Sequence, residues 1–329
     1  MRPLDAAIII AGLAVLAAAA YLGFQMWANS GDLRNATPAA REIEAFRQAL
    51  ARKPNDIDTR MRLAQALAVA GRDPEAVEQY QLVLKVSKDY IPALSGIGFE
   101  YMKQKDWKNG EEYFHRVLTL SEGKTVATGT SSPAEVANYY IGIARMEQGD
   151  YAAAAGYLKV ALSMRQGASD TSYALAVCYK HLGIMDGYKQ TLEYTLQFDP
   201  KMPEANYDYG VLLASQGDLA GAAEHFRTST DAAPYKNEPK QELGKLGTSA
   251  ERLANANKLA SSDTSAALVQ ARIAVAIDPQ SVSALLLTAR LYEKARDTAK
   301  ATDVYQKVLL IDPGNSDATA GLKRVKNGS

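Results

Sequence analysis

The sequence predicts an all-α protein, in which an N-terminal transmembrane helix is followed by a superhelical solenoid of about seven helical hairpins with half-repeat caps. Two observations carry this prediction. An almost wholly apolar tract occupies residues 6–28, and a skeleton of small and large apolar residues then recurs, in most places, every 34 residues. A hairpin of this size buries one stripe of each helix, so each copy needs a neighbour to complete its core. The 329 residues therefore predict stacked units rather than two or three closed domains.

Residues 1–5 form a short tail ahead of the apolar tract at 6–28, whose one strongly polar residue is Gln25. As a helix, a tract of this length spans roughly 34 Å, enough to cross a hydrocarbon core of about 30 Å. The alternative is a cleaved signal peptide, for which the alanines at 17–20 offer a small-residue cleavage site, but the length favours an anchor. The predicted anchor residues include Ala6, Ile10, Leu16, Phe24 and Trp27.

The clearest copy of the repeat spans residues 203–236. Its small eighth and twentieth residues let two helix axes approach, and a large residue of the facing helix fills the space above them. Gly217 is expected to end the first helix and Asp218 to cap the second. Tyr209, Gly210, Leu213, Ala222, Phe226 and Pro234 hold the seventh, eighth, eleventh, twentieth, twenty-fourth and thirty-second places.

This skeleton resembles the tetratricopeptide repeat (TPR), and the resemblance covers nearly the whole chain. It implies a non-enzymatic solenoid that binds proteins, with the first helix of each unit lining the concave face. Together with the apolar tract, the chain resembles bacterial single-span membrane-anchored TPR proteins. These include proteins that present apocytochrome for cytochrome c maturation and proteins that assist secretion or pilus assembly.

The repeat also sets the expected boundaries. Residues 29–38 form a polar linker and residues 39–56 a capping half-repeat. The rest divides into units 1–2 at 57–120, a polar loop insertion at 121–134, units 3–5 at 135–236, a second insertion at 237–247, units 6–7 at 248–315, and a C-terminal cap and tail at 316–329. The second insertion is expected to lengthen the helix that follows it.

Three units depart from the skeleton. Arg145 stands at the eleventh place of unit 3, where a large apolar residue is expected. Tyr188 replaces the small twentieth residue of unit 4, so we expect that hairpin to splay. Unit 6 carries Asn255 at its eighth place and is the weakest copy.

Composition argues against several classes of function. The formal net charge is zero, with 37 basic and 37 acidic residues, which gives no basic footprint for nucleic acid. Cys178 is the single cysteine, which excludes an internal disulfide and a cysteine-based zinc site. None of the three histidines, His115, His181 and His225, has a partner at metal-ligand spacing. We predict no catalytic residues, no metal, no cofactor and no small-molecule substrate.

Partner contacts are expected on the first helices. Their fifth and ninth places are rich in tyrosine and aliphatic residues through the middle of the chain, which suits an amphipathic helix or an extended apolar segment. Packing between adjacent helices is the alternative role for the tyrosines at residues 139, 173 and 207, which are expected to stack as a ladder. The predicted contact residues are Met61, Gln65, Phe99, Met102, Tyr139, Ile143, Tyr173, Val177, Tyr207 and Val211.

The leading hypothesis is a single-pass protein of the bacterial inner membrane that uses extracytoplasmic repeats to hold membrane or exported proteins. A short tail before one span is typical of an uncleaved signal anchor, which favours this orientation. Two alternatives remain open at this point: a permanent structural subunit of a larger membrane complex, and a cytosol-facing receptor.

Overall fold

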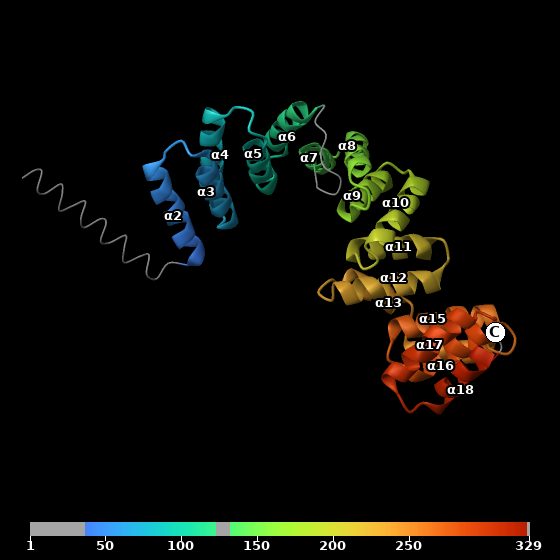
Figure 1. The fold of residues 1–329 in the computed structure, drawn as a ribbon. Coiled ribbons are helices and arrows are strands. Elements are labelled where there is room, and N and C mark those ends of the chain that lie inside the picture. The colour runs from blue at the N-terminus through green and yellow to red at the C-terminus, as the bar shows by residue number, and fades with distance from the viewer. Residues whose placement is uncertain (1–36, 123–131, 328–329) are drawn as a thin grey trace, which may run out of the picture. The chain divides into compact units, whose positions relative to one another are not determined.

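The computed structural model describes residues 37–122 and 132–327, and within these ranges it contains seventeen α-helices and no strand (Figure 1). The predicted anchor at residues 6–28 and nearly all of the predicted linker lie outside the described residues. Within the ranges that are described, no helix is both long and apolar enough to cross a membrane. The chain divides into two compact bodies, residues 1–150 and residues 151–329, which we call the N-terminal and C-terminal bodies.

The N-terminal body stacks its helices in chain order. The α3 and α4 helices form one hairpin and α5 and α6 the next, while α7 packs against α6 about as closely as the helices of a hairpin pack on each other. Its helices are α2 (Pro38–Arg52), α3 (Ile57–Val69), α4 (Asp73–Val86), α5 (Ile91–Lys103), α6 (Trp107–Ser121) and α7 (Pro133–Glu147).

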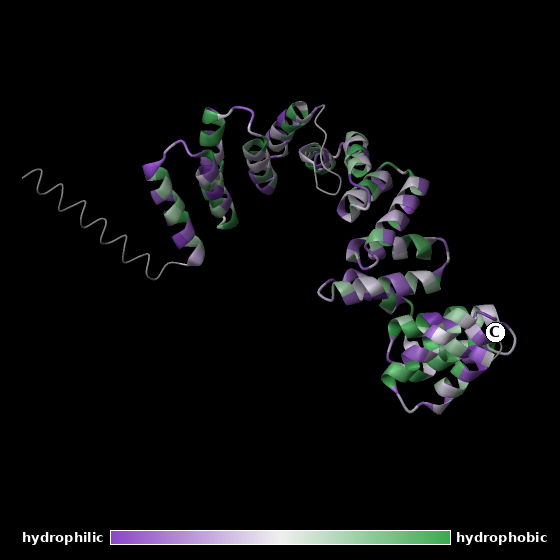
Figure 2. Ribbon diagram, viewed as in Figure 1, coloured by the Kyte–Doolittle hydropathy of each residue, from purple (hydrophilic) through white to green (hydrophobic). Residues whose placement is uncertain are grey.

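The C-terminal body continues the pattern with the hairpins α9–α10, α11–α12, α14–α15 and α16–α17, and α18 packs on α17. Its helices are α8 (Tyr151–Met164), α9 (Ser169–His181), α10 (Met185–Phe198), α11 (Pro203–Ser215), α12 (Leu219–Ala232), α13 (Glu238–Lys245), α14 (Ser249–Leu259), α15 (Thr264–Ile277), α16 (Val282–Lys294), α17 (Thr298–Ile311) and α18 (Ser316–Asn327). Figure 2 shows hydrophobic and hydrophilic residues interleaved along these helices, as expected where each helix buries one stripe.

The local features expected for residues 203–236 are confirmed. A Cβ atom on Gly210 of α11 would lie 2.7 Å from the ring of Phe226 on α12, so glycine permits the close approach of the two helices. Gly217 has a φ of +85° where α11 ends, a conformation that favours glycine. The Asp218 carboxylate accepts a hydrogen bond of 2.9 Å from the backbone N–H of Gly221 and so caps α12.

Two expectations are wrong. Tyr188 does not splay the α9–α10 hairpin, because its side chain is buried, with 3% exposed, against Ala176 and Leu192. The second insertion does not lengthen the next helix but forms the separate helix α13, which packs on α12 and ends before a glycine of positive φ, Gly247. In addition, the boundary between the two bodies falls between α7 and α8, which are the two helices of repeat unit 3.

Candidate protein-binding surfaces

The structure separates by burial the six predicted contact residues of the N-terminal body. Met61 and Met102 are buried, with 7% and 8% exposed, and belong to the core. The Met102 sulfur fills the space above Gly110, 3.1 Å from where a Cβ atom would stand. Gln65 is exposed on α3. The two methionines therefore hold hairpins together and are not available to a partner.

Phe99, Tyr139 and Ile143 are half-buried on α5 and α7. The Tyr140 ring lies with its centroid 4.8 Å from that of Phe99 and 5.0 Å from that of Tyr139, both edge to face. Tyr140 also stacks on the buried ring of Phe114, at 5.2 Å. We call Phe99, Tyr139, Tyr140 and Phe114 the aromatic cluster; edge-to-face and stacked pairs of this kind fix ring orientation. Tyr140 was not among the predicted contact residues.

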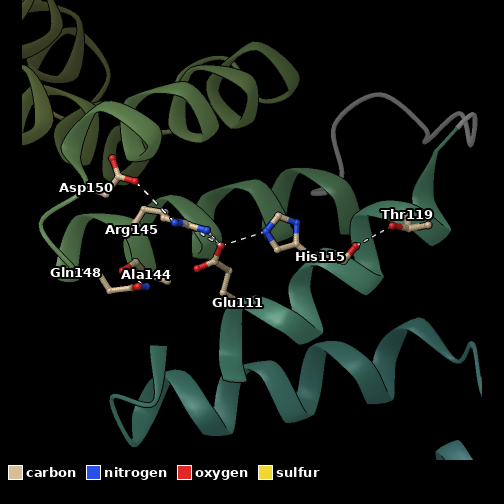
Figure 3. Close-up of polar contacts among 7 residues, drawn as sticks. All are labelled: Glu111, His115, Thr119, Ala144, Arg145, Gln148 and Asp150. Carbon is tan, nitrogen blue, oxygen red and sulfur yellow. Dashed lines mark hydrogen bonds and ion pairs between the residues drawn. The ribbon is translucent and has the colours of Figure 1, made fainter. Parts of the chain in front are cut away.

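A polar cluster joins α6 to α7 in the same body (Figure 3). Glu111 is buried, with 7% exposed. Its carboxylate accepts a hydrogen bond of 2.9 Å from Nε of Arg145 and another from Nη2 of the same guanidinium. His115 Nε2 lies 3.2 Å from the same carboxylate, and Arg145 Nη1 lies 3.7 Å from Asp150. Arg145 departs from the apolar pattern because it neutralises a buried carboxylate of the preceding helix.

In the C-terminal body, Tyr173, Val177 and Tyr207 are half-buried, and Val211 is exposed. They lie on α9 and α11. The residue that links these two helices, Asp208, was not among the predicted contact residues. Asp208 of α11 is buried and accepts hydrogen bonds from the Tyr173 hydroxyl at 2.9 Å and from Lys180 Nζ at 2.8 Å. The sequence does contain a signal for this contact. Lys180 and Asp208 are 28 residues apart, which places opposite charges on successive first helices.

Burial and the Asp208 carboxylate raise the pKa of Tyr173 well above its usual value, so its phenol is a hydrogen-bond donor at neutral pH. The Lys180 ammonium also lies 5.6 Å from the ring centroid of Tyr188. Burial raises the pKa of the Cys178 thiol to about 11, which makes this cysteine unreactive. The donors around Asp208 therefore serve to position α9 against α11.

The expected tyrosine ladder does not form within the C-terminal body. Tyr173 packs in the cluster that contains Tyr188 and Leu192, whereas Tyr207 packs toward Phe226, with ring centroids 6.0 Å apart. Tyr139 belongs to the other body. The shared repeat place therefore gives the three tyrosines different surroundings.

The side chains of these surfaces are suited to contact with a protein partner. Among the described residues, no group of three or more histidine, cysteine or acidic side chains is arranged to hold a metal ion. Two of the buried carboxylates, Glu111 of the second helix α6 and Asp208 of the first helix α11, are each engaged by cationic side chains. Phe99, Tyr139, Ile143, Val177 and Val211 present aromatic and aliphatic surface, which suits the apolar face of a protein segment.

Comparison with known proteins identifies the repeat. Models described as tetratricopeptide repeat match residues 36–91, 137–187, 188–237 and 257–317, which together are more than half of the chain. Over 180 residues the chain is 27% identical to BBSome complex member BBS4 of Xenopus tropicalis, a match that covers 51% of this chain and 33% of that protein. Over 56 residues it is 36% identical to Superkiller complex protein 3 of Mus musculus, covering 17% and 4%. The chain thus matches a third or less of these curated relatives.

Among solved structures, YrrB, described as a TPR protein with an unusual peptide-binding site, superposes with a TM-score of 0.48 at 19% identity. The match covers 60% of this chain and 97% of YrrB. The pilF protein of Pseudomonas aeruginosa superposes with a TM-score of 0.47 at 14% identity, covering 85% of this chain and 100% of the other.

Proposed function

We propose, since the chain belongs to the tetratricopeptide repeat family, that it is a membrane-anchored adaptor that holds another protein beside a bilayer and catalyses no reaction itself. Solenoids of this kind offer extended surfaces to protein partners, and the family serves generally as scaffolding. The observation that supports a membrane anchor is the apolar tract at residues 6–28, which lies directly before the repeats in the sequence. Such a tract is long enough to span a hydrocarbon core.

The proposed setting is the bacterial inner membrane, with the repeats on the extracytoplasmic side. Long domains translocate largely regardless of their charge, so the basic residues that follow the apolar tract are compatible with that orientation. The proposed clients are exported or membrane proteins, such as those of envelope assembly or cytochrome c maturation. They would bind through an amphipathic helix or an extended apolar segment.

Two surfaces support client binding, one on each body. In the N-terminal body it is the exposed part of Phe99, Tyr139 and Ile143, held in place by the other rings of the aromatic cluster. In the C-terminal body it is Val177 and Val211, on first helices that Asp208 fixes. Prearranged aromatic and aliphatic side chains bind at a low cost in conformational entropy.

The anchor is tested by fractionation of the full chain. We expect it to stay in the membrane pellet after an alkaline carbonate wash, and Leu16→Arg combined with Ile10→Arg to release it, because charges at mid-bilayer disfavour insertion. A reporter enzyme that is active only outside the cytoplasm, fused after residue 329, tests the orientation. A chain that washes off the membrane would overturn the anchor, and an inactive reporter would overturn the orientation.

The binding surface is tested by affinity purification of the tagged full chain in mild detergent, with mass spectrometry of proteins recovered at near-stoichiometric amounts. Phe99→Ala with Tyr139→Ala should reduce client recovery while the helical circular dichroism is retained. The matched control is Val86→Ala, which removes an exposed aliphatic side chain from the second helix α4. Recovery that is unchanged by the aromatic substitutions would contradict this surface. A fixed set of membrane proteins would show a structural subunit instead of an adaptor.

A further inference from the structure

The C-terminal body contains a groove of about 710 Å³ that is lined by residues of α12, α15, α16 and α17. Its apolar lining comes chiefly from Leu268 and Val275 of α15, Leu285 and Tyr292 of α16, and Val304 of α17. Three of the four helices are the second helices of their hairpins, so the groove is distinct from the first-helix positions considered above. The volume falls in the ~300–1,000 Å³ range of pockets that enclose a compact group of atoms. It is therefore large enough for a few anchoring side chains and too small for a whole helix.

Most of the charged side chains of the lining are engaged in ion pairs. The Arg272 guanidinium donates two hydrogen bonds, of 2.7 and 2.8 Å, to the Glu224 carboxylate of α12. Arg227 pairs with Asp231 at 2.9 Å, and Lys300 pairs with Asp297 at 3.0 Å. The Lys300 ammonium also lies 5.6 Å from the ring centroid of Tyr292. With four acidic and four basic side chains, the groove also has no net charge to attract a polyanion.

Three polar groups of the lining have no partner among the described residues. Asp303 and Lys307, both exposed, stand one turn apart on α17, and neither makes an ion pair or a hydrogen bond there. The Tyr292 hydroxyl likewise makes no hydrogen bond within the part of the chain that is described. Burial raises the pKa of this phenol, which keeps it a donor at neutral pH. The α17 wall thus presents an anion and a cation in a fixed order.

We propose that this groove binds an amphipathic helix of a protein partner, with its apolar stripe on the lining and, along one border, a cation and an anion that face Asp303 and Lys307. Charges one turn apart on one helix match charges one turn apart on another, because the two spacings are equal. The inference rests on the proposed adaptor function, to which it adds a second surface and the chemistry of its partner. The outer helix surface of a stacked hairpin then has a binding role of its own.

The test uses the full chain in detergent and three synthetic helical peptides of about four turns. The first carries a leucine stripe bordered on one side by lysine and glutamate one turn apart. The second exchanges that lysine and glutamate, and the third keeps the composition but breaks the period of the stripe. We expect the first peptide to bind and the third not to bind.

The deciding variant is Asp303→Lys with Lys307→Asp, which exchanges two exposed charges and leaves the packed residues intact. The variant should bind the first peptide about tenfold more weakly than the unaltered chain does, because two rim ion pairs become two repulsions. Its affinity for the second peptide should equal the affinity of the unaltered chain for the first. The control is Glu112→Lys with Lys323→Asp, an equal exchange of exposed charges outside the groove, which should change neither affinity.

The groove proposal would be overturned if the charge exchange changed neither peptide affinity, or if the third peptide bound as tightly as the first. So would a concentration-dependent dimer that the exchange abolishes, since the occupant would then be a second copy of the chain. The proposed adaptor function is judged separately. It stands if the Phe99 and Tyr139 substitutions reduce client recovery even when no peptide enters the groove, and it falls if the chain leaves the membrane even when the peptide binds.

Discussion

The two bodies support the same repeat place in different ways. In the N-terminal body, the fifth-place residue Tyr139 packs edge to face against Tyr140 and so belongs to the aromatic cluster. In the C-terminal body, the fifth-place residue Tyr173 donates a hydrogen bond to the buried carboxylate of Asp208, which Lys180 neutralises. The first arrangement gains stability from apolar area and the second from charge-assisted hydrogen bonds. The comparison teaches that the repeat fixes where a residue lies, while its neighbours decide what it does.

The largest expected effect comes from overpacking one hairpin in each body. A Cβ atom would stand 2.9 Å from the Phe114 ring at Gly98, and 2.7 Å from the Phe226 ring at Gly210. We expect Gly98→Val and Gly210→Val each to lower the free energy of unfolding by about 3 kcal/mol, because neither ring has free space to move into. Urea unfolding, followed by circular dichroism, measures both changes.

Tryptophan fluorescence tests whether the bodies respond separately. In a Trp27→Phe background, Trp107 reports on the N-terminal body alone. Gly98→Val should shift the fluorescence transition, whereas Gly210→Val should shift the circular dichroism and leave the fluorescence in place. Equal shifts of the fluorescence would mean that the two bodies unfold as one.

Much of the fold was predictable because its causes are local. Gly217 and Asp218 mark a helix end and a helix start by their own conformational and hydrogen-bonding preferences, and both are confirmed. The Gly210 contact with Phe226 was also predictable, because only a hairpin brings the eighth and twenty-fourth places together. The anchor at residues 6–28 remains a prediction from apolar length.

What could not be predicted depends on exchanges between neighbouring helices. Tyr188 fills a place meant for a small residue because its ring is accommodated between Ala176 and Leu192, and a cation lies over it. Asp208 is explained only by Tyr173 and Lys180 of the preceding unit. The groove between α12 and α17 requires helices of three successive hairpins, and no single 34-residue window contains its lining.

The next effect in size is the loss of the Asp208 carboxylate. Asp208→Ala removes an acceptor from Tyr173 and from Lys180, and we expect a loss of about 2 kcal/mol in the free energy of unfolding. Lys180 is 46% exposed in its side chain, so water can replace one of the two bonds and limits the loss. The control is Asp303→Ala in the same body, which should change stability by less than about 0.5 kcal/mol. Similar losses from both variants would mean that Asp208 does not fix α9 against α11.

A double-mutant cycle tests the corresponding polar cluster of the N-terminal body. Arg145→Leu restores the apolar residue that the repeat calls for, yet we expect it to destabilise by about 1.5 kcal/mol because it leaves the buried Glu111 with weaker compensation. Glu111→Gln with Arg145→Leu should recover at least half of that loss, since position 111 then carries no buried charge. Additive losses in thermal unfolding would show that the two side chains do not depend on each other.

The smallest expected effect is a dependence on pH that belongs to the C-terminal body. Burial lowers the pKa of His225, whose Nδ1 lies 2.8 Å from the Asn206 side-chain oxygen. As the pH falls through about 6.5, the unfolded chain takes up a proton at this histidine while the folded chain does not. The unfolded state then binds more protons, so the free energy of unfolding decreases until the pH reaches the lower pKa of the folded state. His225→Gln should therefore flatten the loss of stability between about pH 7 and pH 5.5, measured by urea unfolding at each pH. A slope that His225→Gln leaves unchanged would assign the acid sensitivity to other groups.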